Sequence, residues 1–152
     1  MVTGLAGGSS FYMRETFASD VEVDALVQGF ESGSLLPSEF SHHAHMAVAL
    51  SYASRMQEEV ALARMRAGVQ KFAAAHGKSQ LYHETLTVFW MRLLSHLSRI
   101  YGVDLPLWAK INVIIERWGT RLPIEAHYSP ELIRSDAARS RWMPPDRLPL
   151  SF

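Results

Sequence analysis

The sequence lacks cysteine, an excess of charge of either sign and any long apolar run. Without cysteine, the 152-residue chain forms neither disulfides nor thiolate metal sites, so a metal would need nitrogen and oxygen ligands. Fifteen basic and fifteen acidic residues cancel, which removes the electrostatic reason to expect nucleic acid or an anionic membrane as a partner. No segment approaches the roughly 20 apolar residues of a membrane span. We therefore expect a cytoplasmic protein that binds neither nucleic acid nor membrane.

Strand patterns are also missing, because no alternating run of β-branched residues is bounded by turn residues. Apolar residues instead recur at helical spacing along most of the chain. This pattern predicts helices over about residues 19–33, 38–56, 58–75, 79–101 and 104–118. The second and third are also compatible with one bent helix, since no proline or glycine separates them. The expected fold class is all-α.

The chain after Leu122 has a weaker pattern and several prolines. Proline removes a backbone donor and fixes its own φ, so this tail cannot continue as a long helix. It predicts an irregular, Pro-rich strap across a compact bundle of about five helices. The length suits one domain, and we expect a loose N-terminal segment over residues 1–18 and a single helical domain over residues 19–152.

Histidine is concentrated in two places. Ser41-His42-His43-Ala44-His45 holds three of the seven histidines, and a fourth follows Tyr82. Histidine is the commonest metal ligand and the usual proton-transfer side chain near neutral pH. His42 and His45 are spaced i, i+3 and share a helix face, whereas His43 lies about 100° around the helix. A joint site therefore includes His42 and His45 but not His43.

His83 stands at the head of the apolar stripe predicted for residues 79–101. If that helix packs beside the helix of residues 38–56, the imidazoles of His42, His45 and His83 converge on one point. Three neutral imidazoles form a facial ligand set with open positions, which suits zinc or ferrous iron. We predict a metal-dependent enzyme acting on a small organic molecule, with these three histidines as metal ligands and Glu84 and Tyr82 assisting catalysis.

A competing interpretation makes each histidine a core-edge residue that is hydrogen-bonded to a carbonyl or a carboxylate. Glu84 then complements the helix dipole, and Thr87 bonds to a carbonyl of its own helix. The segment from His83 to Thr87 matches the first half of the zincin motif His-Glu-x-x-His. Because Thr87 stands where the second histidine should be, the protease interpretation fails.

Two further alternatives remain open. One is a metal-free helical enzyme that uses a histidine general base for isomerisation, elimination or cyclisation. The other is a non-catalytic binding or assembly protein, whose interface would be the stripe from Trp108 to Trp118. A small-molecule ligand is the expected partner, and a homo-oligomer is compatible with the sequence. His96 is expected to face solvent, and His127-Tyr128 to form a surface pair.

Three short segments carry a resemblance. Phe40-Ser41-His42-x-x-His45, followed by Tyr82-His83-Glu84-Thr85-Leu86-Thr87 and by Pro145-Asp146-x-Leu148-Pro149-Leu150, resembles a group of small bacterial all-helical proteins. The resemblance covers about residues 35–150 in layout. It implies that His42, His45 and His83 belong together and that His43 does not, and it brings no established reaction.

Overall fold

The computed structural model describes residues 16–152, so most of the segment expected to be loose lies outside the described residues. The described part is helical and contains no strand, which confirms the all-α prediction. Five longer helices are followed by three short ones: α1 (Asp20–Ser32), α2 (His42–Arg55), α3 (Glu58–Ala75), α4 (Glu84–Ile100), α5 (Leu107–Trp118), α6 (Ile124–His127), α7 (Pro130–Ile133) and α8 (Asp136–Ser140).

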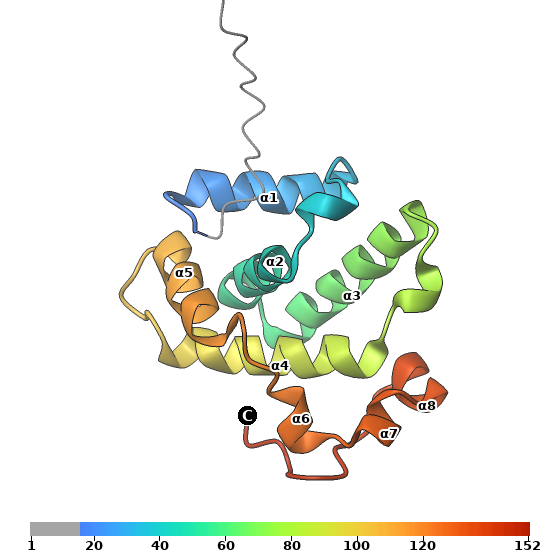
Figure 1. Cartoon of the computed structure of the whole chain (residues 1–152). Coiled ribbons are helices and arrows are strands. Elements are labelled where there is room, and N and C mark those ends of the chain that lie inside the picture. The colour runs from blue at the N-terminus through green and yellow to red at the C-terminus, as the bar shows by residue number, and fades with distance from the viewer. Residues whose placement is uncertain (1–15) are drawn as a thin grey trace, which may run out of the picture.

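The long helix α4 divides the molecule (Figure 1). Helices α1, α2, α3 and α5 lie on one side of it, and α6, α7, α8 and the C-terminal tail lie on the other. Helix α2 is central because it contacts α1, α3, α4 and α5. Its residues from Met46 to Tyr52 are all buried, as expected for a helix that is apolar on most faces.

Helix α1 begins and ends where the sequence predicts. The Ser19 hydroxyl accepts a hydrogen bond from the Glu22 amide, and the Glu22 carboxylate accepts one from the Ala18 amide. These bonds satisfy backbone donors that have no partner inside a helix. Gly33 ends α1 with a φ of 79°, a left-handed conformation that glycine adopts without steric cost.

Helix α2 begins later than predicted and is separate from α3. The predicted range begins at residue 38, whereas the N-cap is Ser41, whose hydroxyl accepts a hydrogen bond from the Ala44 amide at 3.2 Å. Residues Pro37–Glu39 form a short 3₁₀ helix instead. Met56 and Gln57 adopt extended backbone angles, so α2 and α3 are two helices and not one bent helix.

Helices α4 and α5 also begin later than predicted. Residues Ser79–Leu81 form a 3₁₀ turn, and α4 starts at Glu84 with His83 as its N-cap. Helix α5 starts at Leu107 and has Pro106, rather than Asp104, at the N-cap position. The change at α4 matters for the site, because it places His83 before the helix rather than on its apolar stripe.

The C-terminal tail is a strap tied to α4. The Thr85 hydroxyl donates to the Arg141 carbonyl at 2.8 Å and accepts from the Met143 amide at 3.1 Å. Tyr128 donates to the Met143 carbonyl at 2.7 Å and is only 2% exposed. The surface-pair prediction for His127-Tyr128 is therefore wrong, since Tyr128 belongs to the core. His96 is partly exposed, and its ring lies near that of Phe152.

Candidate functional site

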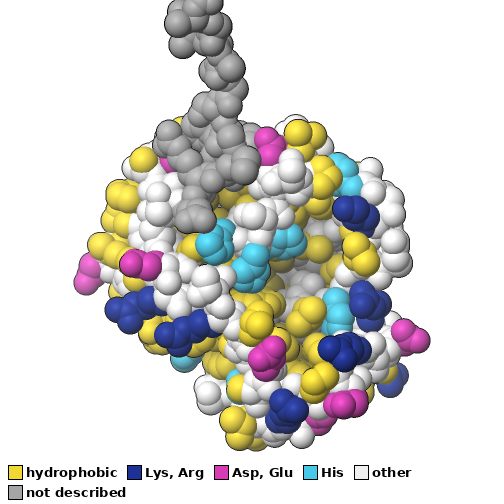
Figure 2. All heavy atoms as spheres, viewed as in Figure 1, with side chains coloured by type: hydrophobic (Ala, Val, Ile, Leu, Met, Phe, Trp, Pro, Cys, Tyr) yellow, Lys and Arg dark blue, Asp and Glu magenta, His cyan; other side chains and the backbone are white. Residues whose placement is uncertain are grey.

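A cavity of about 240 Å³ opens between α2, α3, α4 and the 3₁₀ turn of residues Ser79–Leu81. Figure 2 shows histidine side chains beside a hollow on this face of the molecule, with hydrophobic side chains around it. Most of the lining is apolar, from Met46, Ala49, Met65, Val69, Leu81, Leu86, Trp90, Met91 and Leu94. The polar lining residues are His42, His45, Tyr82, His83 and Thr87.

The three histidines that the sequence groups together all line this one cavity. Tyr82 lines it too, but Glu84 does not. Within residues 16–152, however, no group of three or more histidine, aspartate or glutamate side chains is arranged to hold a metal ion. Lining the same cavity does not by itself make the three histidines a metal site. The hydrogen bonds of each ring show which of them has a free nitrogen lone pair.

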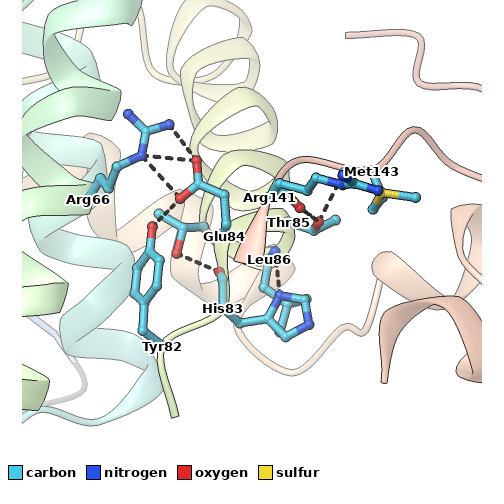
Figure 3. A network of polar contacts seen from close by, with 9 residues as sticks. Arg66, Tyr82, His83, Glu84, Thr85, Leu86, Arg141 and Met143 are labelled. Carbon is cyan, nitrogen blue, oxygen red and sulfur yellow. Dashed lines mark hydrogen bonds and ion pairs between the residues drawn. The ribbon is translucent and has the colours of Figure 1, made fainter. Parts of the chain in front are cut away.

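Both ring nitrogens of His83 are engaged. Its Nδ1 accepts a hydrogen bond from the Leu86 amide at 3.2 Å, which makes the imidazole the N-cap of α4 (Figure 3). Its Nε2 lies 2.7 Å from the Ile133 carbonyl oxygen, which only accepts, so Nε2 carries the proton. A metal ligand needs a free nitrogen lone pair. The predicted three-imidazole site does not fit this arrangement, because His83 would have to leave its cap to bind a metal.

The rings of His42 and His45 differ from that of His83 in their hydrogen bonding. Within the described part of the chain, neither ring has a hydrogen-bond partner. The His45 ring is half-buried and stacks on Phe40 with ring centroids 3.7 Å apart. Burial lowers the pKa of His45 to about 4, with a smaller contribution from neighbouring His42. His45 therefore presents a neutral imidazole to the cavity at pH 7.

His42 is exposed at the mouth of the cavity, where its ring lies edge-on to Trp90 with centroids 5.2 Å apart. Its pKa is lowered by partial burial and by neighbouring His43. His43 is not among the lining residues. Its ring lies at the end of α5, where a Cβ added to Gly119 would come within 2.6 Å of His43 Nε2.

Tyr82 is hydrogen-bonded to an ion pair between Arg66 and Glu84. Arg66 of α3 binds both carboxylate oxygens of Glu84, with distances from 2.6 to 3.1 Å (Figure 3). The Tyr82 hydroxyl donates a further, short hydrogen bond to the same carboxylate. Burial alone would raise the pKa of Glu84, but the bonds from Arg66 and Tyr82 lower it, so Glu84 is ionised. Burial and the bond to Glu84 raise the pKa of Tyr82 to about 12.

Sequence reasoning missed Arg66. It lies one helical turn from Leu62 and from Val69, on the face of α3 that packs inward. A basic residue at such a position in the sequence indicates an ion pair with a carboxylate on a neighbouring helix. The prediction for Thr87 is confirmed, since its hydroxyl donates to the His83 carbonyl at 2.9 Å.

The surface proposed for an assembly interface is largely core. Ile111, Ile114 and Ile115 of α5 are buried, and Trp108 and Trp118 pack against the core. Helix α5 thus uses its apolar stripe against its own neighbours. The cavity remains the better candidate for binding a partner molecule.

Comparisons of the chain with protein-family models, with curated proteins and with solved structures gave no match. The resemblance to small bacterial helical proteins stays a prediction. Across residues 16–152, no helix combines the length and the hydrophobicity needed to cross a bilayer.

Proposed function

We propose that the protein is a metal-free enzyme that moves a proton on a small, largely apolar organic molecule, with His45 as the general base. The observation that supports this proposal is an imidazole on the cavity wall that has no hydrogen-bond partner among the described residues. A bound molecule that offers a proton to His45 gives this ring the hydrogen-bond partner that the described residues do not supply.

The surroundings of His45 suit a proton acceptor. The low pKa keeps the ring in its basic form at neutral pH, although it also limits the ring's strength as a base. Proton transfer would leave an imidazolium beside the anion of the substrate, and the apolar walls strengthen the attraction between them. The Phe40 ring face, stacked on His45, adds a favourable contact to the imidazolium. Isomerisation, elimination and cyclisation can all begin with such a step.

The cavity volume limits the substrate. An apolar cavity of roughly 150 Å³ holds one benzene molecule. At about 240 Å³, this cavity accommodates a molecule of one or two rings, or an aliphatic molecule of similar size.

A metal-dependent enzyme is the second candidate, because His42, His45 and His83 line the same cavity. Zinc or ferrous iron would suit these ligands and would lower the pKa of a bound water. This candidate requires His83 to give up its bonds to Leu86 and Ile133. Elemental analysis of untagged protein distinguishes the two: near-stoichiometric metal that is lost in His83→Ala and kept in His43→Ala would favour the metal enzyme.

The elimination of 5-nitrobenzisoxazole tests the proposal. A base removes the ring C–H proton, the N–O bond breaks, and the product is a coloured cyanophenolate. We expect the protein to accelerate this reaction in the presence of a chelator, and His45→Gln to lower kcat/KM about 100-fold. His43→Gln is the matched control from the same helix turn and should keep the rate. Equal rates for His45→Gln and the unaltered protein, or a requirement for added zinc, would contradict the proposal.

A further inference from the structure

We infer that the ligand of this cavity is a neutral aromatic molecule of one or two rings that donates a hydrogen bond, through O–H or N–H, to Tyr82 and Thr87. The inference rests on the proposed function, since it names the class of molecule that the same cavity binds. It follows from the direction of the hydrogen bonds around the cavity.

The hydroxyl protons of Tyr82 and Thr87 are already in use. Tyr82 donates to the Glu84 carboxylate, and Thr87 donates to the His83 carbonyl at 2.9 Å. The Thr87 hydroxyl also lies within hydrogen-bonding reach of the Tyr82 phenol oxygen. The two oxygens therefore lie close together and have lone pairs, but no free proton, for a ligand.

Neither hydroxyl can reverse its direction without losing a partner. An ionised carboxylate only accepts hydrogen bonds, and Arg66, which does not line the cavity, holds Glu84 in that form. The partner of Thr87 is a backbone carbonyl, which also only accepts. The hydrogen bonds to Glu84 and to the His83 carbonyl thus leave the Tyr82 and Thr87 oxygens able only to accept a hydrogen bond from a ligand.

The rest of the lining favours a neutral, flat molecule. No lysine, arginine, aspartate or glutamate side chain is among the described residues that line the cavity. An ionic ligand would therefore lose its hydration without gaining a counter-charge. Trp90 and three methionines, Met46, Met65 and Met91, supply the aromatic and sulfur contacts that suit an aromatic ring.

Matched probe pairs test the inference by calorimetric titration. Phenol and anisole differ in one donor hydrogen that is replaced by methyl, as do indole and 1-methylindole. We expect the donor of each pair to bind about tenfold more tightly, which is the upper range of a single hydrogen bond. The double variant Tyr82→Phe/Thr87→Val should bring the ratio of dissociation constants close to one. The variant Tyr82→Phe/Thr87→Ser keeps an acceptor oxygen at residue 87 and should restore the tighter binding of the donor probes. His43→Gln should leave the ratio of dissociation constants unchanged.

The outcomes separate this inference from the proposed function. Equal binding of both members of each pair, or a preference for the methylated probes, overturns the inference while the cavity still binds ligand. A donor preference that survives in the double variant also overturns it, since the acceptor would then be another group. If the double variant does not fold, as judged by circular dichroism, Tyr82→Phe and Thr87→Val are measured singly. Each should lower the ratio, and a ratio unchanged in both overturns the inference. No binding of any probe contradicts both proposals.

Discussion

At the residue scale, the three cavity histidines differ in what their nitrogens do. His83 has a partner on each side of its ring, in α4 and α7, whereas His45 has none within residues 16–152. Identical side chains on one cavity wall therefore have different roles. His83 holds the fold together at this point, and His45 is available for chemistry.

The pKa of His45 has a consequence for stability. It is about 4 in the folded protein and 6.5 in the unfolded chain, so the unfolded chain binds more protons between these values. The free energy of unfolding therefore has its full contribution from neutral His45 above pH 6.5. As the pH falls from 6.5 toward 4, this contribution is lost, and the free energy of unfolding decreases by roughly 3 kcal/mol. Urea unfolding at neutral and at acidic pH, compared between the unaltered protein and His45→Gln, measures this loss. Parallel pH dependence in the two proteins would contradict the account.

Substitutions of His83 separate its role as a cap from a role as a ligand. His83→Ala removes both of its hydrogen bonds and should lower the free energy of unfolding by about 2 kcal/mol. His83→Asn retains a side-chain oxygen that can accept from the Leu86 amide, so it should lose about half as much. Thermal and urea unfolding measure both values. An Asn variant no more stable than the Ala variant would show that capping is not the main role of His83.

At the element scale, α1 and α3 approach closely at a glycine. A Cβ at Gly68 would lie 2.5 Å from Cε1 of Phe30, whose ring is 2% exposed and packs near Phe40 and Phe72. Gly68→Ala gains about 1 kcal/mol of helix propensity. Overpacking in the core costs about 1–3 kcal/mol, so we expect a net loss of stability in urea unfolding. Gln70→Ala, at an exposed position of the same helix, is the control. Greater stability of Gly68→Ala would show that the contact relaxes freely.

The elements also show how far the sequence alone reaches. Helical periodicity predicted α1 and the full span of α3. Ser19 and Gly33 at the ends of α1, and Gly77 after α3, are signals that act locally. The predicted start of α4 was wrong because the N-cap of this helix is the imidazole of His83. That cap also bonds to Ile133, fifty residues further along the chain, which no local pattern reveals. The shared face of His42 and His45 followed from their spacing, but the place of His83 beside them and the roles of the ring nitrogens depend on tertiary contacts.

At the scale of the whole molecule, the C-terminal strap completes the far side of α4. It gives the Thr85 hydroxyl, which is fully buried, its two hydrogen-bond partners. Leu150 and Phe152 pack against the core, and the Phe152 ring lies 5.7 Å from that of Phe89. The strap is therefore part of the domain, although it contains no long helix.

Removing the strap tests that conclusion. A chain that ends at Ser140 leaves Thr85 without its partners and uncovers apolar surface on α4. We expect the free energy of unfolding to fall by about 3 kcal/mol or more, because an orphaned buried hydroxyl and lost aromatic packing both contribute. Scanning calorimetry measures the change, and Ser151→Ala, at an exposed strap position, is the control. An unchanged melting temperature would contradict a structural role for the strap.

The proposals for this cavity depend above all on His45 being a neutral, accessible acceptor. Long-range ¹⁵N–¹H correlation spectra of the imidazole rings, recorded against pH and then against added phenol, test it most directly. We expect the His45 ring to stay neutral down to about pH 5. We also expect the ring nitrogens of His45 to shift on addition of phenol, because an aromatic ring then lies in the cavity that His45 lines, while those of His43, which does not line it, do not shift. A His45 ring that titrates near pH 6.5 and does not respond to phenol would contradict the account.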